Sequence, residues 1–227
     1  MRLTNGLATT DSPQCVIPRH QNATRRILYR KRRYPSIPVL ICKRDVKGAF
    51  KQIPVSIRGL AYMGCRFSVY ISMYIALFFG WRPSPENCGL ASPLLMQYIA
   101  AYRPLGEFTD GPEPFIDYQY VDDGAFVEPW IGLRPWPAVS LWERALLECL
   151  GTNSAHQKKR EIEGDAATKL PLWGIVVCAE SETFSMPSDK VGRAREFLAT
   201  ANYDPCVTRL DLRSLQELRG KLEQWSV

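Results

Sequence analysis

The chain has 227 residues, of which 46% are hydrophobic and 11% aromatic, and it carries a formal net charge of +6. This composition is sufficient for a sizeable core and excludes a disordered chain, a collagen-like repeat or a small disulfide scaffold. The longest apolar run, residues 69–81 interrupted by Ser72, has 13 residues, whereas a helix that crosses a bilayer needs about 20. Nothing near Met1 has the pattern of a secretory signal, so we expect a protein of the cytoplasm or nucleus that is not secreted and has no membrane partner.

The seven cysteines are at least 23 residues apart, and there are only two histidines. This spacing does not favour a zinc site. We therefore expect free thiols in a reducing compartment.

The basic charge is concentrated at the N-terminal end. Residues 1–44 hold ten lysines and arginines against one acid, Asp11, which gives a net charge of +9, while the other 183 residues have a net charge of −3. This favours a phosphate-rich partner; the alternative is a solvated basic arm or a localisation signal. The residues expected to bind nucleic acid are Arg25, Arg26, Arg30, Lys31, Arg32 and Arg33.

The first half of the chain contains the signals of several strands and one helix. Residues 1–24 are polar and rich in turn residues, which predicts loop or disorder. The run Val39-Leu40-Ile41-Cys42 predicts a buried strand with Asp45 at its end. Residues 67–74 and 75–79 are rich in β-branched and aromatic side chains and predict strands. Ser92-Pro93 and the apolar spacing that follows predict a helix over about 92–102.

The second half alternates hairpins with helices. Residues 115–121 and 124–127 predict a hairpin with Asp122-Asp123 at its tip and with Gly124 taking a positive φ. A Pro/Trp-rich linker over 129–137 precedes an apolar helical face that stops at Gly151, and residues 151–169 read as a loop. The elements predicted after it are a hairpin of 172–179 and 183–186, a helix from Ser188 and a helix capped by Asp211.

Three carboxylates are candidates for chemistry. Asp45 ends a predicted buried strand, and Asp122-Asp123 follows 77 residues later. Two adjacent acids raise each other's pKa unless a cation neutralises them, so this pair is a candidate seat for Mg²⁺. The alternative is ordinary turn chemistry, which Asp-Asp-Gly also favours.

Three blocks of sequence occur in an ordered series: Asp45-Val46-Lys47-Gly48-Ala49-Phe50, Phe79-Gly80-Trp81-Arg82-Pro83-Ser84-Pro85 and Tyr120-Val121-Asp122-Asp123. Together they resemble the palm of a reverse transcriptase. The first is similar to the family's first catalytic aspartate motif, the second to its template- and nucleotide-gripping motif, and the third to its Tyr-x-Asp-Asp signature.

Later blocks continue the resemblance. Residues 150–158 resemble the motif after the catalytic hairpin, residues 172–190 the primer-grip region and residues 215–222 the start of the thumb. The resemblance covers about residues 38–222 and looks closest to retrotransposon enzymes of the long-terminal-repeat or tyrosine-recombinase type, between which it does not choose.

The resemblance implies an α+β fold, a polymerase palm with an antiparallel sheet and packed helices. Residues 1–37 are then a basic, partly disordered remnant of truncated fingers, residues 38–190 the palm and residues 191–227 the beginning of a helical thumb. The expected chain is thus a partial one, without room for a ribonuclease H or integrase domain.

The resemblance also implies the catalytic groups. Asp45 and Asp122 ligate two Mg²⁺ ions, which Mn²⁺ can replace, and Asp123 is a third, supporting carboxylate. Lys158 protonates or neutralises the pyrophosphate, although Lys159 is adjacent and both lysines have the alternative of a solvated loop.

Other residues are implied to contact the nucleotide or the primer. Phe50 is the aromatic that excludes a 2′-hydroxyl, with plain core as its alternative. Tyr120 and Val121 belong to the signature motif, and Trp173 with Gly174 forms part of the primer grip. The remaining residues implied to bind the nucleotide or template are Phe79, Gly80, Trp81 and Arg82.

The function implied is an RNA-directed DNA polymerase, a nucleotidyltransferase that adds deoxynucleotides to the 3′-hydroxyl of a DNA primer on an RNA or DNA template. The alternative is a catalytically inactive retroelement remnant that only binds nucleic acid. Intact aspartates favour the first hypothesis, and the short segment before Asp45 favours the second. The sequence predicts no oligomeric state.

Overall fold

The computed structural model describes residues 18–103, 115, 117–164, 166–200 and 212–225. The chain divides into two compact units, Met1–Thr168 and Lys169–Val227. This break falls inside the range 38–190 expected to form one domain, and the expected boundaries at residues 37 and 190 stay predictions. Among the described residues no helix is both long and apolar enough to cross a membrane, and the five described cysteines have free thiols.

The first unit contains a three-stranded sheet in the order β1-β5-β4. Its strands are β1 (Val39–Asp45), β5 (Asp123–Pro129) and β4 (Asp117–Tyr120), and both pairings are antiparallel. The register places Asp45 opposite Asp123. Antiparallel strands and packed helices confirm the expected α+β class, and the hairpin predicted around Asp122 is confirmed with β4 beginning at residue 117.

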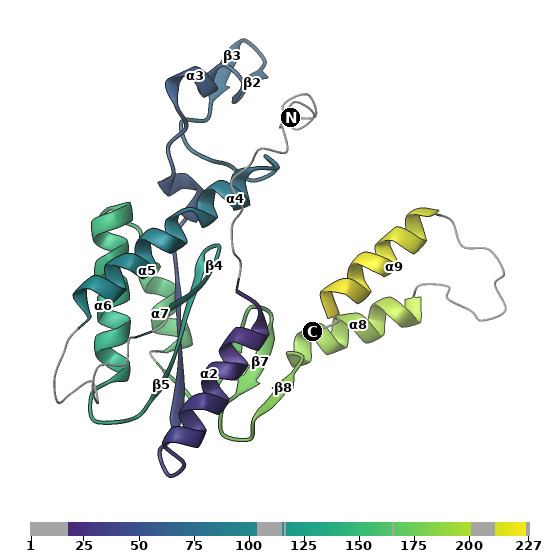
Figure 1. The fold of residues 1–227 in the computed structure, drawn as a ribbon. Coiled ribbons are helices and arrows are strands. Elements are labelled where there is room, and N and C mark those ends of the chain that lie inside the picture. The colour runs from purple at the N-terminus through teal and green to yellow at the C-terminus, as the bar shows by residue number, and fades with distance from the viewer. Residues whose placement is uncertain (1–17, 104–114, 116, 165, 201–211, 226–227) are drawn as a thin grey trace. The chain divides into compact units, whose positions relative to one another are not determined.

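Helices α5 (Ala91–Tyr102) and α6 (Pro135–Leu150) lie side by side in the first unit (Figure 1). On α6, the fully buried Trp142 contacts the ring of Phe126 on β5 edge to face, with centroids 6.4 Å apart. Helix α5 confirms the helix predicted over 92–102. The short helix α4 (Ser84–Gly89) precedes it. The predicted linker over 129–137 is wrong at its end, because α6 already begins at Pro135, a residue favoured in a first helical turn.

Gly124 is required by packing and not by its backbone angle. The residue with positive φ in the turn is Val121, at 55°, so the expected positive φ of Gly124 is wrong. A Cβ on Gly124 would lie 2.6 Å from the Trp142 ring. The close approach of β5 to α6 therefore depends on the missing side chain, one residue from Asp123.

Replacing Gly124 by alanine is expected to destabilise the protein by about 1–3 kcal/mol, because the extra methyl group forces Trp142 away from the sheet. Urea denaturation followed by tryptophan fluorescence measures the loss. Gly192→Ala, on helix α8 (Ser188–Thr200) with no atom near the added methyl group, is the control. Equal stabilities of the two variants would contradict the packing explanation.

Helix α2 (His20–Arg33) lies along β5 and β1 (Figure 1). It corrects the expectation of loop or disorder for residues 20–24. Its inner face carries Ala23 and Ile27, and also Arg26 and Arg30, whose guanidinium groups are buried. An amphipathic helix thus forms in which two of the inward residues are charged.

Glu128 on β5 neutralises the buried arginines. Its carboxylate is fully buried and accepts from Arg30 at 2.9 Å and from Arg134 at 2.6 Å, while Arg26 lies at 3.5 Å. Burying any of these charges alone would cost several kcal/mol. The ionic cluster therefore fixes α2 to the end of the sheet.

The remaining elements of the first unit are short. The hairpin of β2 (Gly64–Phe67) and β3 (Tyr70–Met73) is exposed, and residues 75–79 do not form the predicted strand. The 3-10 helix η1 (Ala49–Gln52) follows Asp45, and α3 (Ile57–Leu60) precedes the hairpin. Helix α7 (Gln157–Glu163) corrects the expected loop over 151–169.

The second unit has a three-stranded antiparallel sheet in the order β6-β7-β8. The predicted hairpin and the helix from Ser188 are confirmed, while Asp211, the expected cap of α9, lies outside the described residues. The elements are β6 (Lys169–Leu172), β7 (Ile175–Cys178), β8 (Thr183–Ser185), α8 (Ser188–Thr200) and α9 (Leu212–Trp225).

Candidate active site

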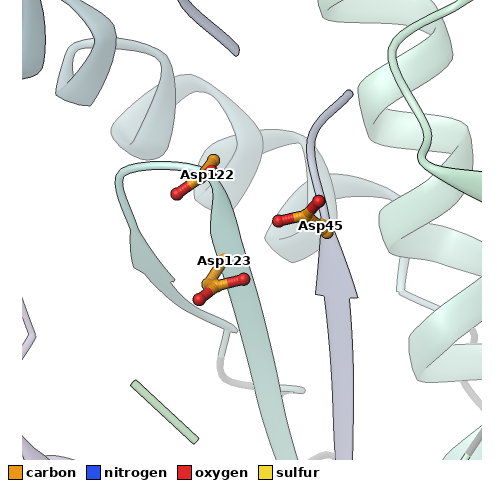
Figure 2. Close-up of side chains that lie close together, drawn as sticks. All are labelled: Asp45, Asp122 and Asp123. Carbon is orange, nitrogen blue, oxygen red and sulfur yellow. The ribbon is translucent and has the colours of Figure 1, made fainter. Parts of the chain in front are cut away.

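Asp45, Asp122 and Asp123 meet at one end of the β1-β5 pair (Figure 2). Each contributes a carboxylate oxygen to a group whose members all lie within 4.8 Å of one another. The expectation that Asp45 and the Asp122-Asp123 turn converge on adjacent antiparallel strands is therefore confirmed. Clustered carboxylate oxygens are the ligands that Mg²⁺ prefers, so the donor set fits this ion.

Backbone hydrogen bonds hold the two aspartate segments together. The N–H of Val46 donates to the carbonyl of Asp122 at 2.7 Å, so the chain stays paired one residue beyond the end of β1. The left-handed backbone of Val121 turns the hairpin just before Asp122. Strand ends joined in this way hold carboxylates more rigidly than a free loop does.

The charged forms of Asp45 and Asp122 are disfavoured by burial. Burial raises the pKa of Asp45 to about 6, with further contributions from Asp123. Burial, followed by the charge of Asp123, also raises the pKa of Asp122. Because the folded state holds the Asp45 proton more tightly than the unfolded chain does, the contribution of Asp45 to the stability of the metal-free protein falls as pH rises from about 4 to about 6. A divalent cation held by the carboxylates would offset this loss by favouring their charged forms.

Two lysines reach the carboxylates. The ammonium of Lys159 lies 2.9 Å from Oδ1 of Asp45 and 3.5 Å from Oδ1 of Asp123. Lys43 approaches the same Asp123 oxygen at 3.4 Å. Lys158, the lysine expected to act, has an exposed side chain. Lys43 was missed, although its spacing of two from Asp45 along a strand places both on one face.

Helix α7 positions Lys159. The ring Nδ1 of His156 caps the helix by accepting from the backbone N–H of Lys159 at 3.2 Å. The backbone N–H of His156 donates to the backbone carbonyl of Asp45 at 3.1 Å. Further along, Arg160 donates to both carboxylate oxygens of Glu143 on α6, at 3.0 and 3.1 Å. These contacts place the start of α7 directly beside the end of β1.

Two of the residues expected around the nucleotide, Phe50 of η1 and Phe79, form an aromatic pair. The ring of Phe50 contacts the ring of Phe79 edge to face, with centroids 4.7 Å apart. Phe50 and Trp81 are half-buried against the core, whereas Phe79 is 82% exposed. Gly80, which lies between Phe79 and Trp81 in sequence, has a positive φ of 90°. Arg82, after Trp81, has an exposed side chain.

The signature residues and the expected primer grip lie in different units. Tyr120 ends β4 with its side chain 40% exposed, and Val121 packs against the core. Trp173 and Gly174 form the tight connection between β6 and β7, both with positive φ. Lys190 donates to the carbonyl of Gly174 at 2.9 Å, which ties α8 to this turn.

The basic run of α2 is split between two faces. Arg26 and Arg30 are engaged with Glu128, so the expectation that they bind nucleic acid is corrected: their guanidinium groups are buried in an ion-pair cluster. The residues of the run whose side chains remain exposed are Arg25, Arg32 and Arg33, while Lys31 is half-buried.

No family model matches the chain, and no curated protein matches it by sequence. Among solved structures, the chain is similar to the foamy viral protease-reverse transcriptase in complex with an RNA/DNA hybrid, with a TM-score of 0.51 and 14% identity over 82% of this chain and 21% of that one. A foamy viral structure with double-stranded DNA gives a TM-score of 0.53 and 15% identity over 81% of this chain and 27% of that one. A second foamy viral structure with double-stranded DNA gives a TM-score of 0.50 and 13% identity over 81% of this chain and 32% of that one.

These similarities show a reverse-transcriptase-like fold. The chain spans only about a fifth to a third of the length of these three foamy viral chains. At this identity the likeness concerns the fold alone.

Proposed function

We propose that this chain is the catalytic core of an RNA-directed DNA polymerase from a retrotransposon, acting in the cytoplasm or nucleus. The observation that supports it most is the group of three carboxylates within 4.8 Å of one another, located on paired strands of a reverse-transcriptase-like fold. Neither the fold nor an acidic cluster would suffice alone. Together they favour template-directed transfer of deoxynucleotides to a primer.

In this proposal Asp45 and Asp122 hold two Mg²⁺ ions and Asp123 supports them. Two bound Mg²⁺ ions would supply a lowered pKa for the primer 3′-hydroxyl and positive charge beside the triphosphate and the leaving pyrophosphate. The aspartates hold this site in place because β1 and β5 are paired up to Asp45 and Asp123. The ammonium of Lys159 reaches the carboxylates, whereas Lys158 is exposed, so Lys159 is the better candidate for the lysine that neutralises the leaving pyrophosphate.

The test is the incorporation of one deoxynucleotide onto a labelled DNA primer annealed to an RNA or DNA template. The proposal predicts extension by the template-directed nucleotide that requires Mg²⁺ or Mn²⁺. Tight binding of the primer-template without any extension would instead support an inactive remnant that only binds nucleic acid.

Phe50→Val is expected to raise the incorporation of ribonucleotides relative to deoxynucleotides by about tenfold or more, because the smaller side chain leaves room for a 2′-hydroxyl. The ratio of kcat/KM for a ribonucleotide and its deoxy counterpart measures this. Phe78→Val, which removes a nearby ring stacked on Tyr74, is the control and should leave the ratio unchanged.

The stability of the Phe50 variant distinguishes a gate from a core residue. Since Phe50 is half-buried and its ring neighbour Phe79 is exposed, truncation should cost less than the roughly 3–5 kcal/mol of a fully buried phenylalanine. An unchanged ratio together with a collapsed melting temperature would assign Phe50 to the core.

The exposed face of α2 is expected to contribute to salt-dependent binding of nucleic acid. Arg25 and Arg32 are seven residues apart, two helical turns, and therefore share one face. Each phosphate contact contributes about 0.9 to the slope of log K against log salt on a duplex. The double variant Arg25→Gln, Arg32→Gln should reduce this slope by about 1.8, measured by fluorescence anisotropy.

Arg144→Gln removes an exposed arginine of α6 and is the control for this measurement. It should leave the slope unchanged. The same slope for wild type and the α2 double variant would place the phosphate contacts on another surface.

A further inference from the structure

Lys159 takes up a position between two of the three candidate metal ligands. Its ammonium contacts Oδ1 of Asp45 at 2.9 Å and Oδ1 of Asp123 at 3.5 Å. Both oxygen atoms are buried. A single positive charge thus bridges the carboxylates of β1 and β5 at the place where a cation shared by them would lie.

The two lysines near the site differ in their freedom to leave it. Lys43 belongs to β1 and its side chain is only 10% exposed, so the strand fixes it beside Asp123. The side chain of Lys159 is 33% exposed and extends from the first turn of α7. A long side chain that is partly exposed can turn its ammonium into water, whereas one enclosed in a strand cannot.

Helix α7 is held by contacts that do not involve the Lys159 ammonium. Nη1 of Arg160 donates to both carboxylate oxygens of Glu143, Arg44 donates to the carbonyl of Gly164 at 3.3 Å, and the backbone N–H of His156 donates to the backbone carbonyl of Asp45. The ammonium can therefore move away from the aspartates while the helix and its backbone stay in place.

We propose that Lys159 is a built-in counter-ion of the aspartate cluster, which a divalent cation must displace in order to bind. This inference rests on the proposed function, because it takes the three aspartates as the metal ligands. In the metal-free protein the ammonium offsets the repulsion among the buried carboxylates. It thereby lowers the apparent affinity of the site for the ion, which binds only when the side chain has moved out.

The test is calorimetric titration of the full chain with Mn²⁺, comparing wild type with Lys159→Met. The ion then no longer competes with the contact between the Lys159 ammonium and Asp45, and it is no longer repelled by that ammonium. The affinity for Mn²⁺ should therefore rise by about tenfold or more. Lys158→Met, one residue away and exposed, is the matched control and should bind Mn²⁺ as wild type does. Lys159→Arg keeps the charge and should stay within about threefold of wild type.

A second readout uses stability and needs no catalysis. In EDTA, Lys159→Met should melt at a lower temperature than wild type, and Mn²⁺ should raise its melting temperature by more than it raises that of wild type. Circular dichroism checks the fold, and Lys159→Gln removes the same charge with a polar side chain if the methionine variant aggregates.

The outcomes separate this inference from the proposed function. Mn²⁺ binding that is equally tight in wild type and in the neutral Lys159 variants overturns the counter-ion role and leaves the metal site intact. A gain in Mn²⁺ affinity that is as large in Lys158→Met as in Lys159→Met overturns the counter-ion role as well. No Mn²⁺ binding in any variant overturns the proposed function, and the counter-ion role with it.

Discussion

Replacing Asp122 by asparagine is expected to lower the rate of nucleotide incorporation by about a thousandfold or more. The carboxylate is one of the two proposed ligands of the ions, and metal ions contribute several kcal/mol of transition-state stabilisation, with each 1.36 kcal/mol equal to a factor of about ten. Single-turnover extension of a labelled primer measures the rate.

The loss should come from chemistry and not from unfolding. Burial and the charge of Asp123 already disfavour the ionised form of Asp122, so a neutral asparagine should leave the melting temperature of the metal-free protein unchanged or raise it. Asp189→Asn removes an exposed aspartate of α8 and serves as the control. An Asp122→Asn variant that retains more than about a tenth of the wild-type rate would contradict its role as a metal ligand.

Replacing Glu128 by glutamine is expected to lower the free energy of unfolding by about 3–5 kcal/mol, because it leaves the buried guanidinium groups of Arg30 and Arg134 without their counter-charge. Such a loss is a large part of the stability of a typical domain. Urea denaturation followed by circular dichroism at 222 nm, which reports the loss of helix, measures it.

Asp189→Asn is the control for the ionic cluster. Asp189 is 66% exposed and pairs with Arg193, which is 70% exposed, so the loss should be about 1 kcal/mol or less. If Glu128→Gln costs no more than Asp189→Asn, then α2 is held by its apolar contacts through Ala23 and Ile27 and the cluster contributes little.

The parts of the fold that sequence patterns predicted are those with local signals. The apolar run before Asp45 and the paired runs around Asp122 identify β1 and the β4-β5 hairpin, and proline with apolar spacing identifies α5. The pairing of β1 with β5 joins segments far apart in sequence, so only the family resemblance indicated that the aspartates converge.

Helices α2 and α7 were missed because their stability comes from distant partners. In α2 the inward arginine Arg30 pairs with Glu128, 98 residues away, and a basic residue gives no sign of burial in a pattern of apolar positions. In α7 the sequence Gln157–Glu163 has almost no apolar face. Its anchor is the pair of Arg160 with Glu143 on α6, which no local rule predicts.

The choice between Lys158 and Lys159 depends on the phase of α7. Successive residues of a helix point about 100° apart, so one of two adjacent lysines faces the aspartates and the other faces water. The capping of α7 by His156 fixes this phase and directs Lys159 inward. Because the sequence pattern predicted a loop instead of α7, it could not indicate which of the two lysines faces the aspartates.

The proposed metal site can be examined most directly by the anomalous scattering of Mn²⁺ in crystals of the chain with a primer-template and a non-hydrolysable deoxynucleotide. Two peaks about 4 Å apart, in contact with carboxylate oxygens of Asp45 and Asp122, are the predicted result. The ammonium of Lys159 should then have left its position between Asp45 and Asp123. Mn²⁺ bound elsewhere, with the three carboxylates still joined by Lys159, would contradict the metal site and the function built on it.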